Sequence, residues 1–205
     1  MEEKLLEILP KVTETFMKFG IKSVTMDDIA RNLRMSKKTL YQFVSDKNDL
    51  VSKCIRQEHS EDKCRIKEIL DRDLNAIDEM FAITEMVSEQ LKQVHPSIFY
   101  DLEKYYPEAW NEFHSFKNEF VFDIIRKNIE KGKAEGHYRS DVNALVIARL
   151  YVNRMDDIWN PDVFPSNEFN FHELYLEVMR YHIRGIASQE GIDYLVHKVK
   201  KQIQA

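Results

Sequence analysis

Apolar residues recur at three- and four-residue steps along almost the whole chain, and this spacing constrains the fold more than any other feature. The first run of this kind consists of Leu5, Ile8, Val12, Phe16 and Phe19. Glycine and proline number only five each among 205 residues, too few for the many turns of an all-β protein. The sequence therefore predicts an all-α fold of long helices joined by few connections.

The periodic segments predict ten helices, and Pro10 and Gly20 bear on the course and the end of the first one. These helices are expected at about residues 5–19, 25–33, 37–44, 47–71, 74–94, 97–105, 108–135, 142–159, 171–189 and 192–204. Pro10 should kink the first helix or mark a restart, and Gly20 should end it. One long loop is expected from Asn160 to Asn167.

The composition points to a protein of the cytoplasm without a membrane partner. The longest fully apolar run, Ala144–Ala148, is far shorter than a membrane span, and the acidic N-terminus does not resemble a secretory signal. Cys54 and Cys64 are too few for a disulfide framework, so a reducing compartment is expected. We interpret both cysteines as ordinary helix residues, and redox sensing is the alternative.

The local motifs of common enzymes and cofactor sites are absent from the sequence. It contains no Gly-x-Gly, no phosphate-binding loop, no Gly-x-Ser-x-Gly and no clustered Cys/His spacing. We therefore expect no cofactor, no metal and no enzymatic activity. An enzyme would need a site assembled from distant residues of the helical core.

Positive charge is concentrated in one short segment of an otherwise acidic chain. The formal net charge is −5, yet the segment from Arg31 to Lys47 holds five basic residues and one acidic residue. A local basic surface on an acidic protein is typical of a nucleic-acid reader.

The same segment has the pattern of a helix-turn-helix motif. Thr25 is a good N-cap for one short helix, with Asp28 three residues later, and Ser36 is a good N-cap for the next. The second helix would carry Lys37 and neighbouring polar side chains into the major groove of DNA. Lysines and hydroxyls there suit phosphate contacts, and Gln42 has the reach for a base edge.

Three stretches of this region resemble the TetR family of bacterial transcriptional regulators. They are Gly20–Ala30, Met35–Tyr41 and Asp46–Leu50, in the family's order and at its spacing. The resemblance covers about the first quarter of the chain, and the remainder agrees in length and helix count. It implies a DNA-binding head at residues 1–46 and an effector-binding and dimerisation domain at residues 47–205.

The residues and the resemblance together predict the DNA contacts. The predicted contact residues are Thr25, Arg34, Ser36, Lys37, Lys38, Thr39, Tyr41, Gln42 and Lys47. The resemblance also implies that Ile29, Ala30, Leu33 and Leu40 hold the head together. Arg34 departs from the family, which usually has glycine in this turn, and strain is expected there if the turn needs a positive φ. Phe43 and Val44 also depart from the family pattern.

A small-molecule pocket is a further implication of the resemblance, since TetR-like cores usually hold one. The candidate ligand-binding residues are Trp110, Phe113, His114, Phe120, Arg149 and Asn153. Apolar walls with a few polar groups would suit a hydrophobic or aromatic effector. The alternative is that the aromatic residues are simply helical core and that the polar ones face solvent.

The last long helices carry apolar stripes that suit a homodimer interface. The candidate interface residues are Val152, Met155, Trp159, Leu174, Val178, Tyr181 and Gly185. The resemblance implies pairing of these helices about a two-fold axis on a palindromic double-stranded DNA operator. The function implied is a ligand-responsive regulator, most often a repressor. The alternatives are an effector-free helical interaction protein and an enzyme with its site in the helical core.

Overall fold

A computed structural model describes the backbone of residues 2–204 and the side chains of residues 3–198. Its named elements are all helices, and the pairing seen outside them in the described part is an isolated antiparallel bridge between Tyr138 and Ala187. The all-α prediction is confirmed. The chain divides into two compact units, unit 1 (Met1–Arg65 and Gln93–Phe116) and unit 2 (Ile66–Lys92 and Lys117–Ala205).

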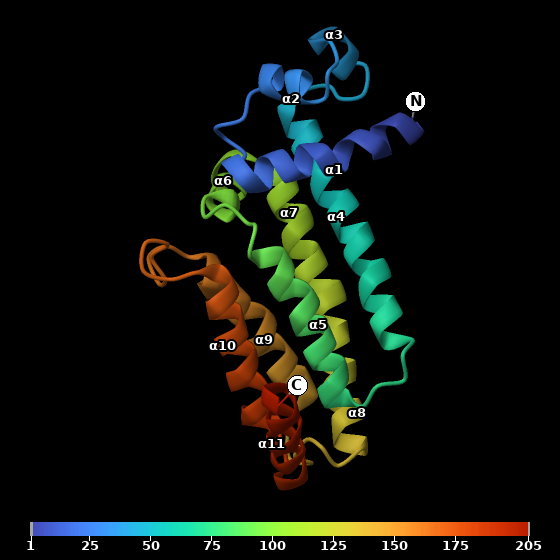
Figure 1. Ribbon diagram of the computed structural model, residues 1–205, viewed down its shortest axis with the longest axis vertical. Helices are drawn as coiled ribbons and strands as arrows, with labels where there is room; N and C mark the ends of the chain where they lie inside the picture. The colour runs from blue at the N-terminus through green and yellow to red at the C-terminus, as the bar shows by residue number, and fades with distance from the viewer. Residues whose placement is uncertain (1, 205) are drawn as a thin grey trace. The chain divides into compact units, whose positions relative to one another are not determined.

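Unit 1 gathers the N-terminal helices and two helices from the middle of the chain (Figure 1). Its helices are α1 (Glu2–Phe19), α2 (Met26–Asn32), α3 (Lys37–Leu40), most of α4 (Lys47–Leu70), α6 (Ile98–Tyr105) and α7 (Pro107–Phe116). A single apolar core joins them, and its fully buried members include Val12, Ile29, Leu40, Leu50 and Leu102. The buried faces follow from the three- and four-residue spacing of the sequence.

Unit 2 is built on α5, α8, α9 and α10. Its elements are the end of α4, α5 (Ala76–Leu91), η1 (Lys117–Val121), α8 (Phe122–Ala134), α9 (Ala144–Trp159), α10 (Phe171–Ile186) and α11 (Gln189–Gln204). Helix α8 packs on α5 and α9, and α10 also packs on α5 and α9. A buried polar network ties α5 to α8, since Asn128 donates to Glu79 at 2.8 Å and Lys131 donates to Glu79 at 2.7 Å.

Of the two alternatives for Pro10, the restart is not seen, because helix α1 continues through this exposed residue. Two other helix predictions differ from the structure. The α-helix expected at residues 37–44 ends at Leu40. The single helix expected at residues 108–135 is interrupted by the π-helical turn η1, where Lys117 is buried and paired with Asp156. Periodicity alone gives no sign of such a turn, because an inserted residue shifts the helix face without breaking it.

No helix in the described residues combines the length and apolar character needed to cross a membrane. The two cysteines have different surroundings, Cys54 being buried and Cys64 exposed, and both are free thiols. Burial raises the pKa of Cys54 to about 12, so its thiol stays protonated and unreactive at neutral pH.

Candidate nucleic-acid interface

Helix α2 begins with a reciprocal cap. The Thr25 hydroxyl accepts a hydrogen bond from the backbone N–H of Asp28 at 3.2 Å, and the Asp28 carboxylate accepts from the Thr25 N–H at 3.0 Å and from its hydroxyl at 2.6 Å. These bonds from Thr25 hold the pKa of Asp28 below its usual value. The cap fixes the first helix of the motif, as the sequence predicts, and it engages the hydroxyl that was also expected to contact DNA.

The turn after α2 places Arg34 in the left-handed region, with φ at 53°. The Arg34 N–H bonds to the Arg31 carbonyl at 3.1 Å and the Met35 N–H to the Ala30 carbonyl at 3.0 Å, the pattern of a Schellman helix end. This is the position at which glycine avoids a steric cost. The strain expected from Arg34 is therefore present, while its side chain extends into solvent.

Helix α3 is capped by one hydroxyl and anchored by one leucine. The Ser36 hydroxyl accepts from the Thr39 N–H at 3.0 Å and lies 2.7 Å from the Thr39 hydroxyl. Leu40 is 0% exposed and fixes the inner side of the helix. The polar side chains left on the outer side are Lys37, Lys38, Tyr41 and Gln42, all exposed, and we call these four residues the recognition surface.

The lysines of the recognition surface remain available to a phosphate. Lys37 pairs with Asp27 at 3.1 Å, and both side chains are about half exposed. Such a surface pair contributes little to stability, so a DNA phosphate can replace the carboxylate. Lys38 has no ion pair among the residues that the structure describes.

Lys47, in contrast, points into unit 1. Its ammonium group donates to the Ile21 carbonyl at 2.6 Å and lies 5.7 Å from the centre of the Tyr106 ring. Burial lowers its pKa, against the opposing effect of Asp101 and Asp28. Lys47 thus holds the turn between α1 and α2, and a phosphate contact would require it to leave these partners.

Sequence reasoning missed the residue that fixes this turn from the other side. Asp101 of α6 is buried and accepts from the Lys22 N–H at 2.9 Å and from the Ser97 hydroxyl at 3.1 Å. Gly20 (φ 81°) lies so close that an added Cβ would be 2.6 Å from the Ser97 hydroxyl. No local pattern could reveal Asp101, because 79 residues separate it from Lys22.

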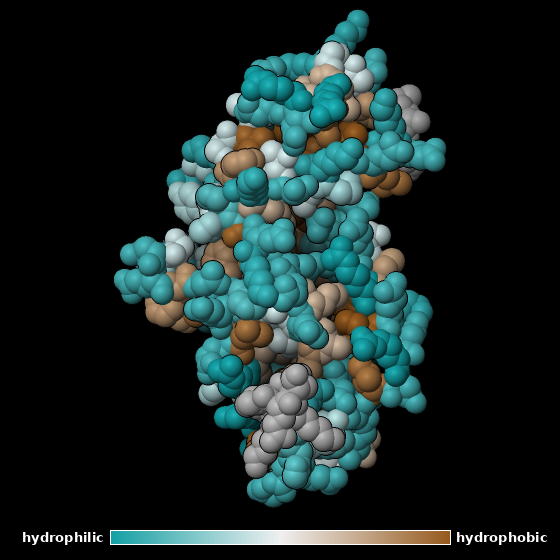
Figure 2. Space-filling model, in the orientation of Figure 1, coloured by the Kyte–Doolittle hydropathy of each residue, from teal (hydrophilic) through white to brown (hydrophobic). Residues whose placement is uncertain are grey.

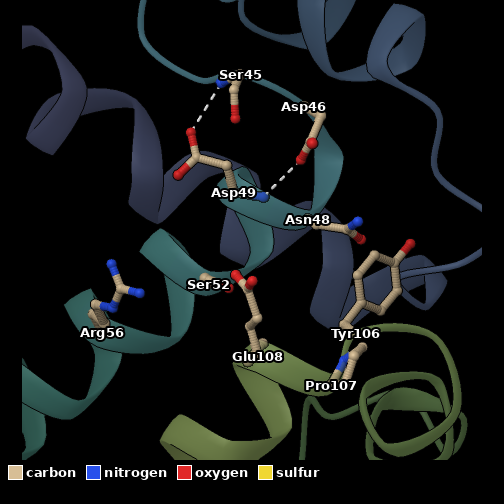
Figure 3. A pocket seen from close by; sticks show the side chains of 10 residues that line it. Ser45, Asp46, Asn48, Asp49, Ser52, Arg56, Tyr106, Pro107 and Glu108 are labelled. Carbon is tan, nitrogen blue, oxygen red and sulfur yellow. Dashed lines mark hydrogen bonds between the residues drawn. The ribbon is translucent and has the colours of Figure 1, made fainter.

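A polar hollow of about 410 Å³ lies in unit 1 where α4 and α7 begin (Figure 3). The Asp46 carboxylate caps α4 through the Asp49 N–H at 2.9 Å, and Asp49 accepts from the Ser45 N–H at 2.9 Å. Glu108 adds a third carboxylate to the lining, against a single guanidinium from Arg56. The excess of negative charge disfavours phosphate, so this hollow does not extend the recognition surface.

The comparisons with known proteins identify the motif. Residues 8–54 match the family described as bacterial regulatory proteins, tetR family. The chain is 24% identical over 172 residues to the HTH-type transcriptional regulator YvaF of Bacillus subtilis (strain 168), covering 83% of this chain and 90% of that protein. The chain therefore carries the DNA-binding segment of the tetR family of bacterial regulatory proteins in its first quarter. It is a DNA-binding transcriptional regulator, and TetR-family proteins are not enzymes.

Solved structures agree with the fold of a TetR-family protein. A TetR-family regulator from Agrobacterium tumefaciens superposes with a TM-score of 0.73 at 14% identity, covering 91% of this chain and 99% of that one. A transcriptional regulator from Cytophaga hutchinsonii gives 0.70 at 19% identity, covering 91% and 98%. At these identities the likeness shows the fold alone.

The structure distributes the predicted ligand residues over both units. Trp110 stacks on Phe113 in unit 1, with ring centres 5.6 Å apart, and His114 meets the Trp110 ring edge-on at 4.4 Å. In unit 2, Phe120 packs against an apolar cluster and Arg149 stacks on Phe122 at 4.2 Å. The last predicted residue, Asn153, is exposed.

The predicted dimer residues also separate into two groups. Val152 and Met155 are 0% and 5% exposed, so their side chains belong to the core of unit 2 and not to an outer surface. Trp159, Leu174 and Val178 are half-buried, while Tyr181 and Gly185 are exposed. The apolar stripe predicted on α9 thus faces inward, and other residues of α9 face out.

Proposed function

We propose that the chain is a ligand-responsive repressor that binds a palindromic operator as a homodimer. In this proposal residues 1–46 read DNA, and residues 47–205 dimerise and bind the effector. The observation that carries the dimer is a set of large apolar side chains left in solvent on α9 and α10. They are Leu145 (59% exposed), Val146 (52%), Leu150 (54%) and Tyr181 (64%), and we call them the apolar face.

The surroundings of the apolar face suit a second helix pair. A hollow of about 200 Å³ between α9 and α10 is lined by Leu150, Tyr181 and Gly185 among others. A Cβ added to Gly185 would meet nothing within 4 Å, so no neighbour within the chain requires glycine there. Glycine inside a helix costs about 1 kcal/mol relative to alanine, and close approach of another chain would explain it.

Symmetry connects such a dimer to a palindromic operator. A two-fold interface pairs the same patch on both copies, and each copy then presents one recognition surface. Two helix-turn-helix heads related in this way read half-sites about 34–36 Å apart. An effector that binds one dimer geometry better than another changes operator affinity, and DNA changes effector affinity by the same factor.

The effector proposed from the sequence is hydrophobic or aromatic. The ring cluster of unit 1 supports this choice, since Phe113 contacts both Phe99 and Trp110. His59 also stacks on Phe116, with ring centres 4.1 Å apart. Effector binding there would change the fluorescence of Trp110.

Selection on random duplex DNA tests the proposal. Wild-type protein should recover a palindromic motif, while Tyr41→Ala should not, because Tyr41 belongs to the recognition surface. Purified operator then allows a screen for compounds that alter affinity. Recovery of a single, non-repeated half-site would contradict the dimer, and DNA affinity indifferent to every compound would favour the effector-free alternative.

A further inference from the structure

A groove of about 760 Å³ runs between α5, α10 and α11 in unit 2. Its volume lies within the range of about 300–1,000 Å³ that small-molecule sites occupy. None of the predicted ligand residues lines it. The sequence therefore does not predict this groove, and its lining shares no residue with the aromatic cluster of unit 1.

The walls of the groove are mainly apolar. They include Phe81, Ala82, Leu176, Ile183, Leu195 and Val196. Ile183 and Leu195 are buried, whereas Val196 is 43% exposed at the rim. Figure 2 shows hydrophobic side chains reaching the surface among hydrophilic ones over the region of α5 and α10. Such a lining favours the aliphatic part of a ligand.

The two ends of the groove can be distinguished. His172, near the start of α10, has its Nδ1 3.0 Å from the carbonyl oxygen of Ser88, near the end of α5. The two helices are therefore antiparallel, and Arg184 near the end of α10 lies toward the beginning of α5. Arg72 precedes α5 in the chain and also lines the groove at this end.

The charges differ between these ends. The guanidinium groups of Arg72 and Arg184 are exposed and form no ion pair within the described part of the chain. The other cationic side chains of the lining are already paired, Lys198 with Asp78 and Arg180 with Glu177. Glu85 places a carboxylate toward the opposite end. Two unpaired guanidinium groups on a chain of net charge −5 form a local attraction for an anion.

We propose that this groove binds a linear aliphatic carboxylate, with its chain along α5 and α10 and its carboxylate against Arg72 and Arg184. Arginine is suited to this head group because its planar fork donates two parallel hydrogen bonds to a carboxylate. Glu85 opposes the reverse orientation by like-charge repulsion. The inference rests on the proposed regulatory function and adds to it a second effector class, at a site lined by other residues than the aromatic cluster of unit 1.

The length of the groove indicates a ligand of medium chain length. Leu176 and Arg184 both line it and are eight residues apart, which is about 12 Å along the axis of α10. An extended chain of about ten carbons, at about 1.25 Å for each carbon, spans this distance. Decanoate is therefore the first probe.

Calorimetric titration of the full-length protein with decanoate tests the site directly, without DNA. Decanoate should bind more tightly than octanoate by about four-fold for each methylene lost. Arg184→Gln and Arg72→Gln should each weaken decanoate binding about ten-fold, since each removes a charge-assisted hydrogen bond. Arg139→Gln is the matched control, because Arg139 is an exposed arginine of unit 2 that lies outside the groove.

A second pair of variants tests the apolar wall. Val196→Glu should weaken decanoate binding at least ten-fold, whereas Val163→Glu should leave it unchanged. The two valines are matched at 43% and 47% exposed, and only Val196 lines the groove. Both sites are solvent-accessible, so neither substitution should prevent folding, which circular dichroism checks.

Three outcomes would overturn the proposal. Decyltrimethylammonium binding as tightly as decanoate would show that the guanidinium groups do not select an anion. Equal decanoate affinity in wild type and in the Arg72→Gln/Arg184→Gln double variant would place the ligand elsewhere. Loss of self-association in Val196→Glu, without decanoate binding in wild type, would assign the groove to a second copy of the chain.

These measurements distinguish failure of the groove site from failure of the proposed regulatory function. Decanoate that binds as described but leaves operator affinity unchanged would retain the site and contradict its role as an effector site. Operator binding that responds to aromatic compounds while decanoate fails to bind would retain the regulatory function and overturn the groove.

Discussion

The recognition surface of α3 and the apolar face of α9 and α10 are both exposed, but their chemistry is opposite. The first consists of lysine, tyrosine and glutamine side chains that keep their hydration. The second consists of leucine, valine and tyrosine side chains that are more than half exposed. Phosphate contacts weaken steeply with salt, while apolar burial is little affected by it. Binding through the recognition surface should therefore weaken as ionic strength rises, while association through the apolar face should change little.

The largest expected effect comes from placing a charge in the apolar face. Leu150→Asp should weaken dimerisation at least 100-fold, because two-fold symmetry brings a carboxylate from each copy into an apolar interface. Sedimentation equilibrium measures the dimer constant. Affinity for a palindromic operator should fall with it, since each monomer contacts only a half-site.

Val163→Asp is the control for that variant. Val163 is 47% exposed and lies in the loop after α9, outside the apolar face. Equal dimer constants for Leu150→Asp and wild type would show that the apolar face is not the interface. Strong salt dependence of dimerisation would contradict its apolar character.

A pH dependence follows from His182, which lines the hollow beside the apolar face. Burial, with a smaller effect from Arg154, lowers its pKa from the usual 6.5 to about 4. The unfolded chain therefore binds the extra proton between these values, so this contribution to stability is complete above pH 6.5 and is lost as the pH falls toward 4. Wild type should lose about 2 kcal/mol of unfolding free energy from this group between pH 7 and pH 5.

His182→Phe isolates that contribution, since phenylalanine keeps a ring against Tyr151, whose ring centre is 5.0 Å away. Urea unfolding at both pH values should show a smaller loss for the variant than for wild type. An identical loss would mean that His182 is already protonated, or freely accessible, in the folded protein.

The recognition surface was largely predictable from the sequence because its determinants are local. Thr25 and Asp28, and likewise Ser36 and Thr39, cap their helices across three residues. Spacing alone therefore indicates the motif, the inner leucine and the exposed lysines. Lys47 is the exception, because its hydrogen-bond partner, the Ile21 carbonyl, lies in the turn between α1 and α2, 26 residues earlier in the chain.

The apolar face was not predictable in the same way. Leu150 and Val152 are both apolar and nearly adjacent on α9, yet one is 54% exposed and the other is 0% exposed. Which of them faces the core depends on the packing of α8 and α10 against α9, and periodicity does not contain that information. The groove of unit 2 is assembled from three helices, so no local motif marks it either.

Single substitutions in the recognition surface should have a smaller effect than Leu150→Asp. Lys37→Ala should weaken operator binding about ten-fold and reduce the slope of log affinity against log salt by about 0.9. Tyr41→Ala should weaken binding with little change in that slope, because tyrosine carries no charge. Fluorescence anisotropy across a salt series measures both quantities.

Lys127→Ala is the matched control, an exposed lysine of α8 in unit 2. Thermal unfolding of all three variants should stay near wild type, since Lys37 and Tyr41 are exposed. Operator affinity unchanged in both Lys37→Ala and Tyr41→Ala would contradict the recognition surface.

The smallest effect is expected at Arg34, where stability of the turn favours glycine but affinity for DNA favours the arginine charge. Arg34→Gly should raise stability by about 1 kcal/mol, because glycine adopts the φ of 53° without strain. The melting temperature of a chain of this size would then rise by about 2–4 °C. Operator affinity should fall a few-fold and its salt slope should decrease, since a guanidinium beside the phosphates is lost.

Arg34→Ala separates the effect of strain from the effect of charge, because it removes the charge and keeps the strained Cβ. If Arg34→Gly and Arg34→Ala melt together, the strain at this turn is negligible; if both keep wild-type affinity, Arg34 does not contact DNA.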